Sequence, residues 1–258
     1  MTLMSLSQNQ QEIKTNKQLL GGIMKGIGFC SGSDSGKYEG VYSRKPGFTP
    51  HRIELDNMQW TKLQQYDKFV YSRISHLSKL AANENKSLME AAKLPNFSQL
   101  EWTSANQKEE FKSFTNVIFT QDEFFNKPRQ DLNDHNSWTY GIFSFKSKKD
   151  FHPLPTVFTP SGHGLHFPKF KMEIDFSKKP CIMEILWKTS TMVHHTKKAP
   201  PEIINHDKMS HFGCSFQINH KLLNVGDKFL KMTPTEINSK VNEYFERNIQ
   251  DQKRTKKY

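Results

Sequence analysis

The side chains with the clearest potential for chemistry are Asp131 and His194, a carboxylate and an imidazole from separate stretches of the sequence. Two imidazoles and one carboxylate on one face form the ligand set of non-haem Fe(II) oxygenase sites. The first imidazole of such a set stands two residues before the carboxylate, since residues i and i+2 of an extended segment project to the same side. That position is Arg129 here. A guanidinium stays protonated and has no lone pair for a metal, so the pattern supplies two of the three ligands.

Three neighbouring side chains are alternative ligands for a rearranged site. Asp134 and His135 follow Asp131 in an Asn/Asp-rich segment, from which either could reach the same ion. The other interpretation of this segment is a solvated turn. His195 adjoins His194, but successive residues of a strand face opposite sides, so we expect His195 to point away.

The elements that must position these residues are predicted from periodicity. Residues 161–196 open with a Gly-rich turn, continue with short alternating apolar runs and reach the paired histidines. Short strands separated by turns are typical of the second half of a double-stranded β-helix. Residues 114–120 and 138–145 are β-branched and aromatic, and they predict two further strands. Apolar residues spaced by three and four over 56–93 predict helices. The fold class is therefore α+β, with a double-stranded β-helix (jelly-roll, cupin-like) core and flanking N-terminal helices.

Composition limits the partners and the compartment. The formal charge of +11 over 258 residues favours a polyanion such as nucleic acid, although scattered lysines also serve solubility alone. The isoelectric point is about 9.4. Three widely separated cysteines exclude a disulfide framework and a zinc ribbon. No signal peptide and no membrane-spanning run is recognisable, so we expect an intracellular protein, nuclear or cytoplasmic, without a membrane partner.

Three regions are predicted along the chain. Residues 1–20 are polar and are predicted to be disordered. Residues 21–232 are predicted to form one domain that contains the candidate site, and they show no internal repeat and no convincing linker. Residues 233–258 are predicted to form a C-terminal helix that ends in a basic tail.

Several segments, taken in order, resemble the Tet-like 2-oxoglutarate/Fe(II) dioxygenase domain of the TET/JBP superfamily, abundant in fungal and especially rust-fungal proteins. The matching segments are MKGIGF at Met24–Phe29, LPNFSQLEW at Leu94–Trp102, FTNVIFTQDEFFNKPRQDLNDHNSWTYGIF at Phe114–Phe143, the stretch from the glycine turn to HHT, and FGCSFQIN at Phe212–Asn219. The resemblance implies Fe(II) and 2-oxoglutarate as cofactors and oxidation of 5-methylcytosine in a base flipped out of its stack.

The resemblance also assigns site residues. It implies Asp131 and His194 as metal ligands, Arg129 at the place of the missing first His, and His211 at the place of the arginine that pairs with 2-oxoglutarate. By strand alternation, Asn116 and Thr120 share one face and are candidates to line the cosubstrate pocket.

These replacements leave three hypotheses open. The chain is a Tet-like dioxygenase, or it is a catalytically inactive pseudoenzyme that binds nucleic acid or protein. A cupin that binds a sugar or another small molecule without redox chemistry is the third. Imidazole at position 211 lacks the bidentate fork and most of the fixed charge of arginine, and Arg129 opposes a divalent cation. Together the two residues argue against turnover.

Overall fold

The structure is a computed structural model that describes residues 2–13, 19–30, 40–42, 44–45, 47–99, 110–132, 134, 137–154, 162–176, 182–229, 231–233, 235–236 and 239. Its elements, in chain order, are α1 Thr2–Asn9, β1 Leu19–Cys30, β2 Gly40–Val41, α2 Pro50–Leu77, α3 Lys79–Ala91, β3 Asn116–Asn126, β4 Thr139–Ser147, β5 Gly164–Phe167, a 3-10 turn at Pro168–Phe170, β6 Met172–Asp175, β7 Met183–Trp187, β8 His195–Thr196, α4 Pro201–Ile204, β9 Met209–Gln217 and α5 His220–Phe229.

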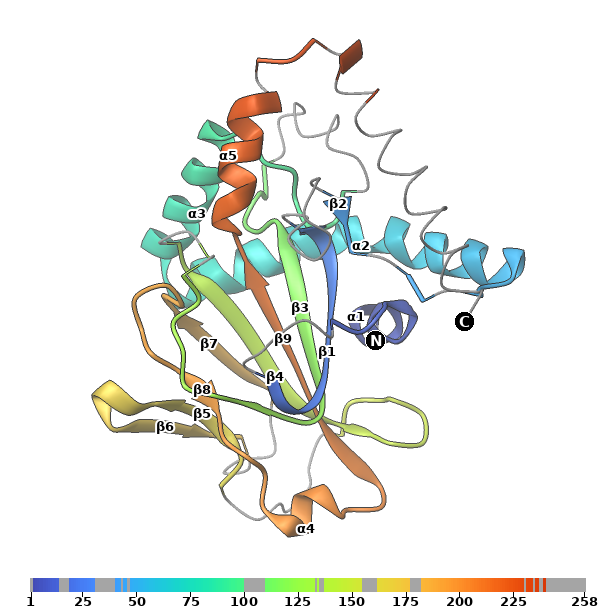
Figure 1. Ribbon diagram of the computed structural model, residues 1–258, viewed down its shortest axis with the longest axis vertical. Coiled ribbons are helices and arrows are strands. Elements are labelled where there is room, and N and C mark those ends of the chain that lie inside the picture. The colour runs from blue at the N-terminus through green and yellow to red at the C-terminus, as the bar shows by residue number, and fades with distance from the viewer. Residues whose placement is uncertain are drawn as a thin grey trace.

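The strands form two antiparallel sheets. The main sheet has the order β2-β1-β3-β9-β4-β7, and the small sheet has the order β6-β5-β8. Figure 1 shows the long strands of the main sheet side by side, with the small sheet near one end of β4 and β7. In the main sheet β9 lies between β3 and β4, which places the last strand of the chain at the centre. The predicted mixture of helices and antiparallel sheet is confirmed, and neither sheet closes on itself across the described residues.

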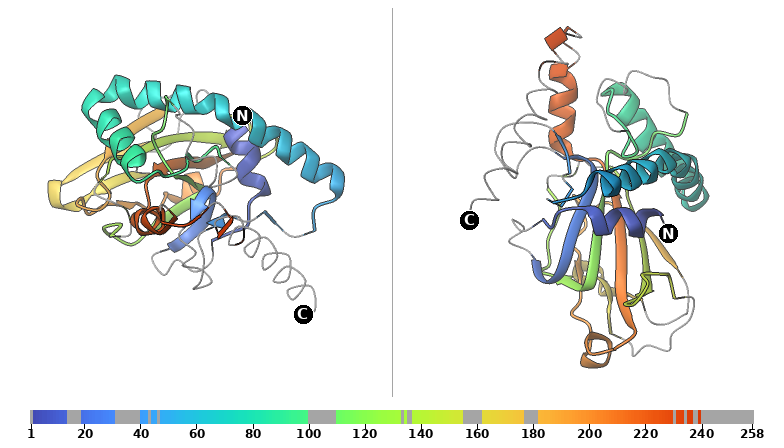
Figure 2. Two further views of the ribbon diagram at one scale, coloured as in Figure 1. Left: turned by 90° about the horizontal axis from the view of Figure 1, so that it is seen from above. Right: turned by 90° about the vertical axis from the view of Figure 1, so that its right-hand side faces the viewer.

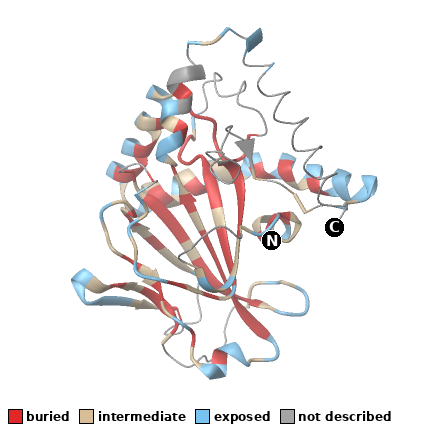
Figure 3. Cartoon of the chain, in the orientation of Figure 1, coloured by how far each residue is buried: buried red, intermediate tan, exposed pale blue. Residues whose placement is uncertain are grey.

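The two faces of the main sheet pack against different layers. Alternate residues such as Val117, Phe119 and Phe216 share a core with α2 and α3. On the opposite face, Phe143 and Trp187 share a second core with Leu165 and other residues of the small sheet. Figure 2 shows α2 and α3 lying across one side of the sheet, and Figure 3 shows buried residues along its strands. The order of layers is therefore helices, main sheet and small sheet.

The helical layer begins earlier than the sequence predicts. Thr49 Oγ1 accepts a hydrogen bond from Arg52 N, and Pro50 occupies the first turn, so a capped α2 begins at Pro50 rather than near residue 56. Ser78 then ends α2 and caps α3 through Ala81 N. Arg73 of α2 pairs with Glu184 of β7, which ties this layer to the edge of the main sheet.

The structure tests the prediction for the N-terminal segment but describes little of the C-terminal one. Residues 2–9 form α1 where disorder is predicted, because Leu6 is fully buried and Ser7 Oγ accepts a hydrogen bond from Gln121 Nε2 of β3 at 2.6 Å. A few apolar contacts suffice to order this otherwise polar segment. Most of the predicted C-terminal helix over 233–258 lies outside the described residues. The domain boundaries themselves stay predictions. No described helix is both long and apolar enough to cross a membrane.

A backbone irregularity bends β3 just before the candidate site. Asp122 and Glu123 have positive φ angles of 56° and 54°, and the register with β1 shifts opposite them. Gly22 of β1 has a φ of +75°, and a Cβ there would lie 2.4 Å from Phe124 Cα. Only glycine permits this close approach. Bulges of this kind bend a strand and redirect the chain that follows, here toward residues 127–131.

Candidate functional site

Two segments far apart in sequence are joined beyond the end of β3. Arg129 and His194 exchange two backbone hydrogen bonds, with N–H to carbonyl distances of 3.0 and 2.9 Å. Asp131 N donates to Thr189 O at 3.0 Å, which adds another link between the two segments. These backbone hydrogen bonds place the side chains at 129 and 131 beside His194. The convergence that the sequence predicts for Asp131 and His194 is therefore present.

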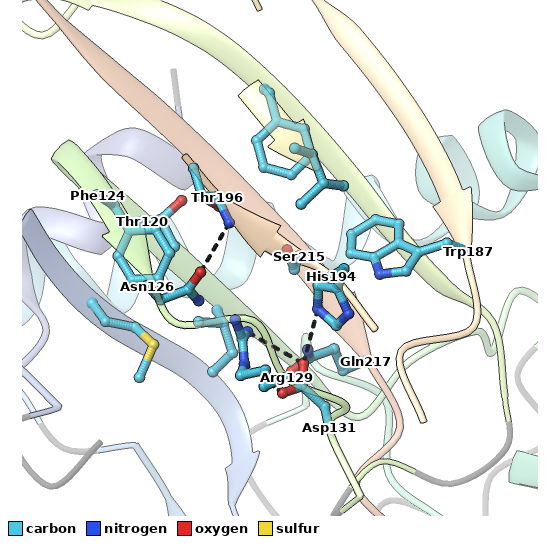
Figure 4. Close-up of a pocket in the computed structure, with 14 residues that line it drawn as sticks. Thr120, Phe124, Asn126, Arg129, Asp131, Trp187, His194, Thr196, Ser215 and Gln217 are labelled. Carbon is cyan, nitrogen blue, oxygen red and sulfur yellow. Dashed lines mark hydrogen bonds and ion pairs between the residues drawn. The ribbon is translucent and has the colours of Figure 1, made fainter. Parts of the chain in front are cut away.

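The three side chains form one polar network. Arg129 Nε donates to Asp131 Oδ1 at 2.7 Å, and Nη2 donates to Oδ2 at 3.3 Å. His194 Nε2 lies 3.4 Å from Asp131 Oδ2. Figure 4 shows the guanidinium and the imidazole approaching the carboxylate from two sides. Arg129 and Asp131 thus form an ion pair at the two positions where the resemblance implies metal ligands.

The orientation of His194 is fixed by its other nitrogen. Nδ1 lies 2.9 Å from the carbonyl oxygen of Met192, which can only accept, so Nδ1 carries a proton. Nε2 is the nitrogen that faces Asp131 Oδ2. A backbone carbonyl on the far nitrogen is the usual support of a metal-binding histidine. His194 thus keeps the orientation of a ligand.

The charge of Asp131 is well supported. Burial alone would raise its pKa, but the hydrogen bond with His194 and the charge of Arg129 outweigh burial and hold the pKa of Asp131 below its ordinary value. The carboxylate is therefore ionised, and its charge is already balanced by the guanidinium.

Asp134, an alternative ligand, is held elsewhere. Its side chain is buried, and Oδ2 accepts a hydrogen bond from Thr189 Oγ1 at 2.7 Å. Thr189 Oγ1 also lies 3.1 Å from Thr139 Oγ1. Burial and the nearby charge of Asp131 raise the pKa of Asp134 well above its ordinary value. Asp134 is absent from the pocket wall, and a carboxyl that favours its neutral form is a poor cation ligand.

The two remaining alternatives do not join the network. His135 lies outside the described residues. His195 belongs to β8, and its Nε2 lies 2.9 Å from His166 Nδ1 of β5. The side chains of His194 and His195 therefore contact different groups, as strand alternation predicts.

A pocket opens beside the network. It lies between the two sheets, and Figure 4 shows the residues around it. The wall is formed by Met24, Ile118, Thr120, Phe124, Asn126, Arg129, Asp131, Phe143, Leu165, Trp187, His194, Thr196, Ser215 and Gln217. Asn126 Oδ1 accepts a hydrogen bond from Thr196 N at 2.9 Å, which joins the end of β3 to β8.

The predicted cosubstrate residues are placed unequally around this pocket. Thr120 contributes to its wall, and its predicted contact with a cosubstrate stays a prediction. Asn116 lies further along the same face, and its buried Oδ1 has no hydrogen-bond partner among the described residues. Sequence reasoning missed Asn126, Ser215 and Gln217. Alternation along β9 was a usable signal for Ser215 and Gln217, because both lie on the face opposite the buried Cys214 and Phe216.

His211 lies in a fully buried aromatic environment rather than on the pocket wall. Its ring stacks on Phe176 at 4.9 Å with an interplanar angle of 8°, and the centroid of the His163 ring lies 4.6 Å away. Neither nitrogen of His211 has a hydrogen-bond partner within the described part of the chain. Burial first, and then the nearby His163 and Lys146, hold its pKa well below the ordinary value. A neutral, enclosed imidazole cannot supply the charge that an arginine offers to a carboxylate.

The residues present do not fit an iron ion. Over the described ranges, no three His, Cys, Asp or Glu side chains form a metal-ligand group. The third position is held by a guanidinium, which cannot coordinate and which already occupies both oxygens of Asp131. The chemistry of this site is therefore that of a closed ion-pair network beside a pocket lined by both polar and apolar side chains.

Comparison with known proteins connects this geometry to a family. The profile described as the Tet-like 2OG-Fe(II) oxygenase superfamily matches residues 2–199. A search of curated proteins finds no match. Among solved structures, "NgTET1 in complex with 5mC DNA" is similar, with a TM-score of 0.39 and 13% sequence identity. The similarity covers 77% of this chain and 61% of that chain, so this chain spans less than two thirds of its length.

The matched residues include Arg129, Asp131 and His194 but end before His211, so the assignment of position 211 to the cosubstrate stays a prediction. The fungal source that the resemblance implies also stays a prediction. Because the profile matches most of the chain, this protein belongs to the Tet-like 2OG-Fe(II) oxygenase superfamily.

Proposed function

We propose that this chain is a non-catalytic member of its family, a pseudoenzyme in which Arg129 has taken the place of an iron ligand. The observation that carries the proposal is the 2.7 Å hydrogen bond from Arg129 Nε to Asp131 Oδ1, with His194 on the other side of the same carboxylate. The two facing sheets support a double-stranded β-helix as the scaffold that this family would use.

Electrostatics give the physical reason. A site of two neutral imidazoles and one carboxylate has a net charge of about −1 and attracts a divalent cation. With Arg129 the same site is about neutral, and a metal would have to displace a charge-assisted hydrogen bond before it reached Asp131. The guanidinium would then remain as an unpaired positive charge next to the ion. The loss of net negative charge and the nearby guanidinium both disfavour the binding of Fe(II).

The role that we propose in place of oxidation is binding, with nucleic acid as the partner. The formal charge of +11 supports contacts to phosphates, and such binding weakens steeply with salt. A nuclear or cytoplasmic location follows from this role and is part of the proposal.

A second candidate is an active Fe(II)- and 2-oxoglutarate-dependent dioxygenase that oxidises 5-methylcytosine. It is favoured by the orientation of His194 Nε2 and by the 3.4 Å that separates this atom from Asp131 Oδ2. Two ligands of one ion lie at about this separation when metal–ligand bonds are near ~2 Å. This candidate requires a third ligand and the displacement of Arg129.

Titration with Fe(II) and 2-oxoglutarate under anaerobic conditions separates the two candidates. We expect the full chain to develop no visible absorbance from an Fe(II)–2-oxoglutarate complex and to form no succinate in air. Iron binding that is lost in Asp131→Asn, or succinate formation by the unaltered chain, would overturn the proposal.

A matched pair of substitutions tests the assignment of position 129. Arg129→His restores the imidazole and should gain Fe(II) binding, whereas Arg129→Gln removes the charge without supplying a ligand and should not. A folded Arg129→His protein that binds no Fe(II) would contradict the assignment. The double variant Arg129→His/His211→Arg tests whether cosubstrate binding returns as well.

Nucleic-acid binding is tested by gel shift over a salt series with methylated and unmethylated duplex DNA. We expect binding that weakens as salt increases and that differs little between the two duplexes. The absence of salt-dependent binding would contradict the proposed role and would favour a small-molecule-binding protein.

A further inference from the structure

The paired histidines of this chain contribute to two different surfaces. His194 belongs to the pocket between the sheets, whereas His195 lies on the small sheet opposite His166. The same register places His166 opposite Glu173 of β6. Residues paired across neighbouring strands share one face of a sheet, so His195, His166 and Glu173 form a row on the small sheet. The neighbours of His166 along β5, Leu165 and Phe167, are buried in the second core, so this row lies on the opposite, outer face.

The two imidazoles of this row face each other directly. His166 Nδ1 lies 2.9 Å from His195 Nε2, and the ring centroids are 5.0 Å apart with an interplanar angle of 81°. Both residues are partly exposed, so an ion from solvent can reach them. Two nitrogen ligands at bond lengths of about 2.0–2.1 Å on a tetrahedral ion are separated by roughly 3.3 Å. An opening of a few tenths of an ångström would therefore admit a metal between these two nitrogens.

We propose that His166 and His195 form a surface site for a divalent transition-metal ion of the zinc, copper or nickel class. Imidazole nitrogen is the ligand that these ions prefer, and neither ring is needed for the second core. Across the described residues no third His, Cys, Asp or Glu side chain completes a ligand group, so water fills the other positions. This proposal is independent of the pseudoenzyme proposal, since it uses neither Asp131 nor His194.

The surrounding charges are nearly balanced. Glu173 accepts hydrogen bonds from Lys197 Nζ at 2.8 and 3.0 Å, so its carboxylate is engaged by a lysine rather than directed at the imidazoles. The cross-strand hydrogen bond requires one ring to donate and the other to accept. A bound metal takes the place of that shared proton, which moves to the other nitrogen of the donor ring. The metal would thereby link β5 to β8, the strand that adjoins the pocket.

The experiment is calorimetric titration of the full chain with Zn²⁺ alone, in a buffer without chelating groups. We expect one Zn²⁺ per chain, with affinity at least tenfold weaker in His166→Gln and in His195→Gln. Gln keeps a polar, hydrogen-bonding side chain at these partly exposed positions, and circular dichroism checks the fold. His51→Gln is the matched control, because His51 is an exposed histidine on α2, and its affinity should be unchanged.

Asp131→Asn distinguishes this site from the pocket and should also leave Zn²⁺ affinity unchanged. Electron paramagnetic resonance of bound Cu²⁺ should show two nitrogen ligands in the unaltered chain and fewer in either histidine variant. The proposal is overturned if the unaltered chain binds no Zn²⁺, if both histidine variants bind as tightly as it does, or if Asp131→Asn abolishes binding.

Discussion

Two polar clusters lie on the same face of the main sheet, and they are built in opposite ways. The cluster of Arg129, Asp131 and His194 is charged, and each side chain has a partner. The cluster of His163 and His211 is uncharged and fully buried, and three of its four ring nitrogens have no partner among the described residues. The fourth, His163 Nδ1, lies 3.0 Å from Lys197 O.

The difference shows two ways in which polar side chains are accommodated on this face of the sheet. In the first cluster a guanidinium balances the carboxylate, which keeps its charge. In the second cluster aromatic rings enclose neutral imidazoles, since Phe143 and Phe176 stack on the His211 ring. Removing a charge from the first cluster should cost the energy of one ion pair. Adding a charge to the second cluster should destabilise the folded protein much more.

The largest effect is expected for His211→Arg. It would place a permanent positive charge in a fully buried aromatic environment, and we expect a loss of about 4 kcal/mol in the free energy of unfolding. His211→Phe is the matched control, with a change within about 1 kcal/mol, because it removes two unpartnered nitrogens and keeps the stacking. Denaturant unfolding measures both. A stable His211→Arg protein would contradict the description of this cluster as one that excludes charge.

Acid should destabilise the protein through His163. Burial lowers the pKa of His163 from its ordinary 6.5 to about 4, so the folded protein resists protonation. Above pH 6.5 the ring is neutral in both states. As the pH falls from 6.5 to about 4, the unfolded chain takes up a proton that the folded chain does not, and stability falls by about 3 kcal/mol. Below about 4 both states are protonated, and this contribution falls no further.

Unfolding at a series of pH values measures this slope. The double variant His163→Gln/His211→Phe removes both buried imidazoles and should lose most of the slope between pH 6.5 and 4. If the free energy of unfolding changed with pH in the same way in this variant, other groups would cause the acid sensitivity. The description of the second cluster as one that resists protonation would then be wrong.

The sequence predicts the first cluster better than the second. The spacing of Arg129 and Asp131 in an extended segment, with His194 on a later strand, is a local pattern, and the structure brings these residues together. The surroundings of His211 depend on Phe176 and His163, whose approach to β9 is set by how the small sheet packs on the main sheet. Sequence periodicity carries no information about that packing, so the enclosure of His211 was not predictable.

The same contrast holds for the fold. Residues 116–126 and 139–147 are strands because alternation and β-branched residues are local signals. Leu80 and Phe69 are 64% and 52% exposed, although both belong to the apolar residues spaced by three and four over 56–93 that predict the helices. The chain turns at Ser78 between α2 and α3, and this turn changes which residues face the sheet. The spacing of apolar residues alone does not show that the helix is interrupted at Ser78.

A smaller effect is expected for Asp131→Asn. It leaves Arg129 without its counter-ion in a largely buried position, and we expect a loss of about 2 kcal/mol. The double variant Arg129→Gln/Asp131→Asn should recover at least half of this loss, because the unpaired charge is gone. Chemical unfolding of the two single variants and the double variant gives the coupling energy. A coupling energy near zero would contradict the description of this cluster as charge-paired.

The smallest effect is expected at Thr189, which supports the first cluster from behind. Thr189→Val keeps the shape of the side chain but removes the hydroxyl that donates to Asp134 Oδ2 and contacts Thr139, at a cost of about 1 kcal/mol. Thr189→Ser keeps the hydroxyl and should lose less, through the missing methyl alone. Thermal unfolding compares the two variants. An equal loss in both variants would mean that packing rather than hydrogen bonding holds Asp134. The surroundings of the first cluster would then depend on packing, as those of the second cluster do.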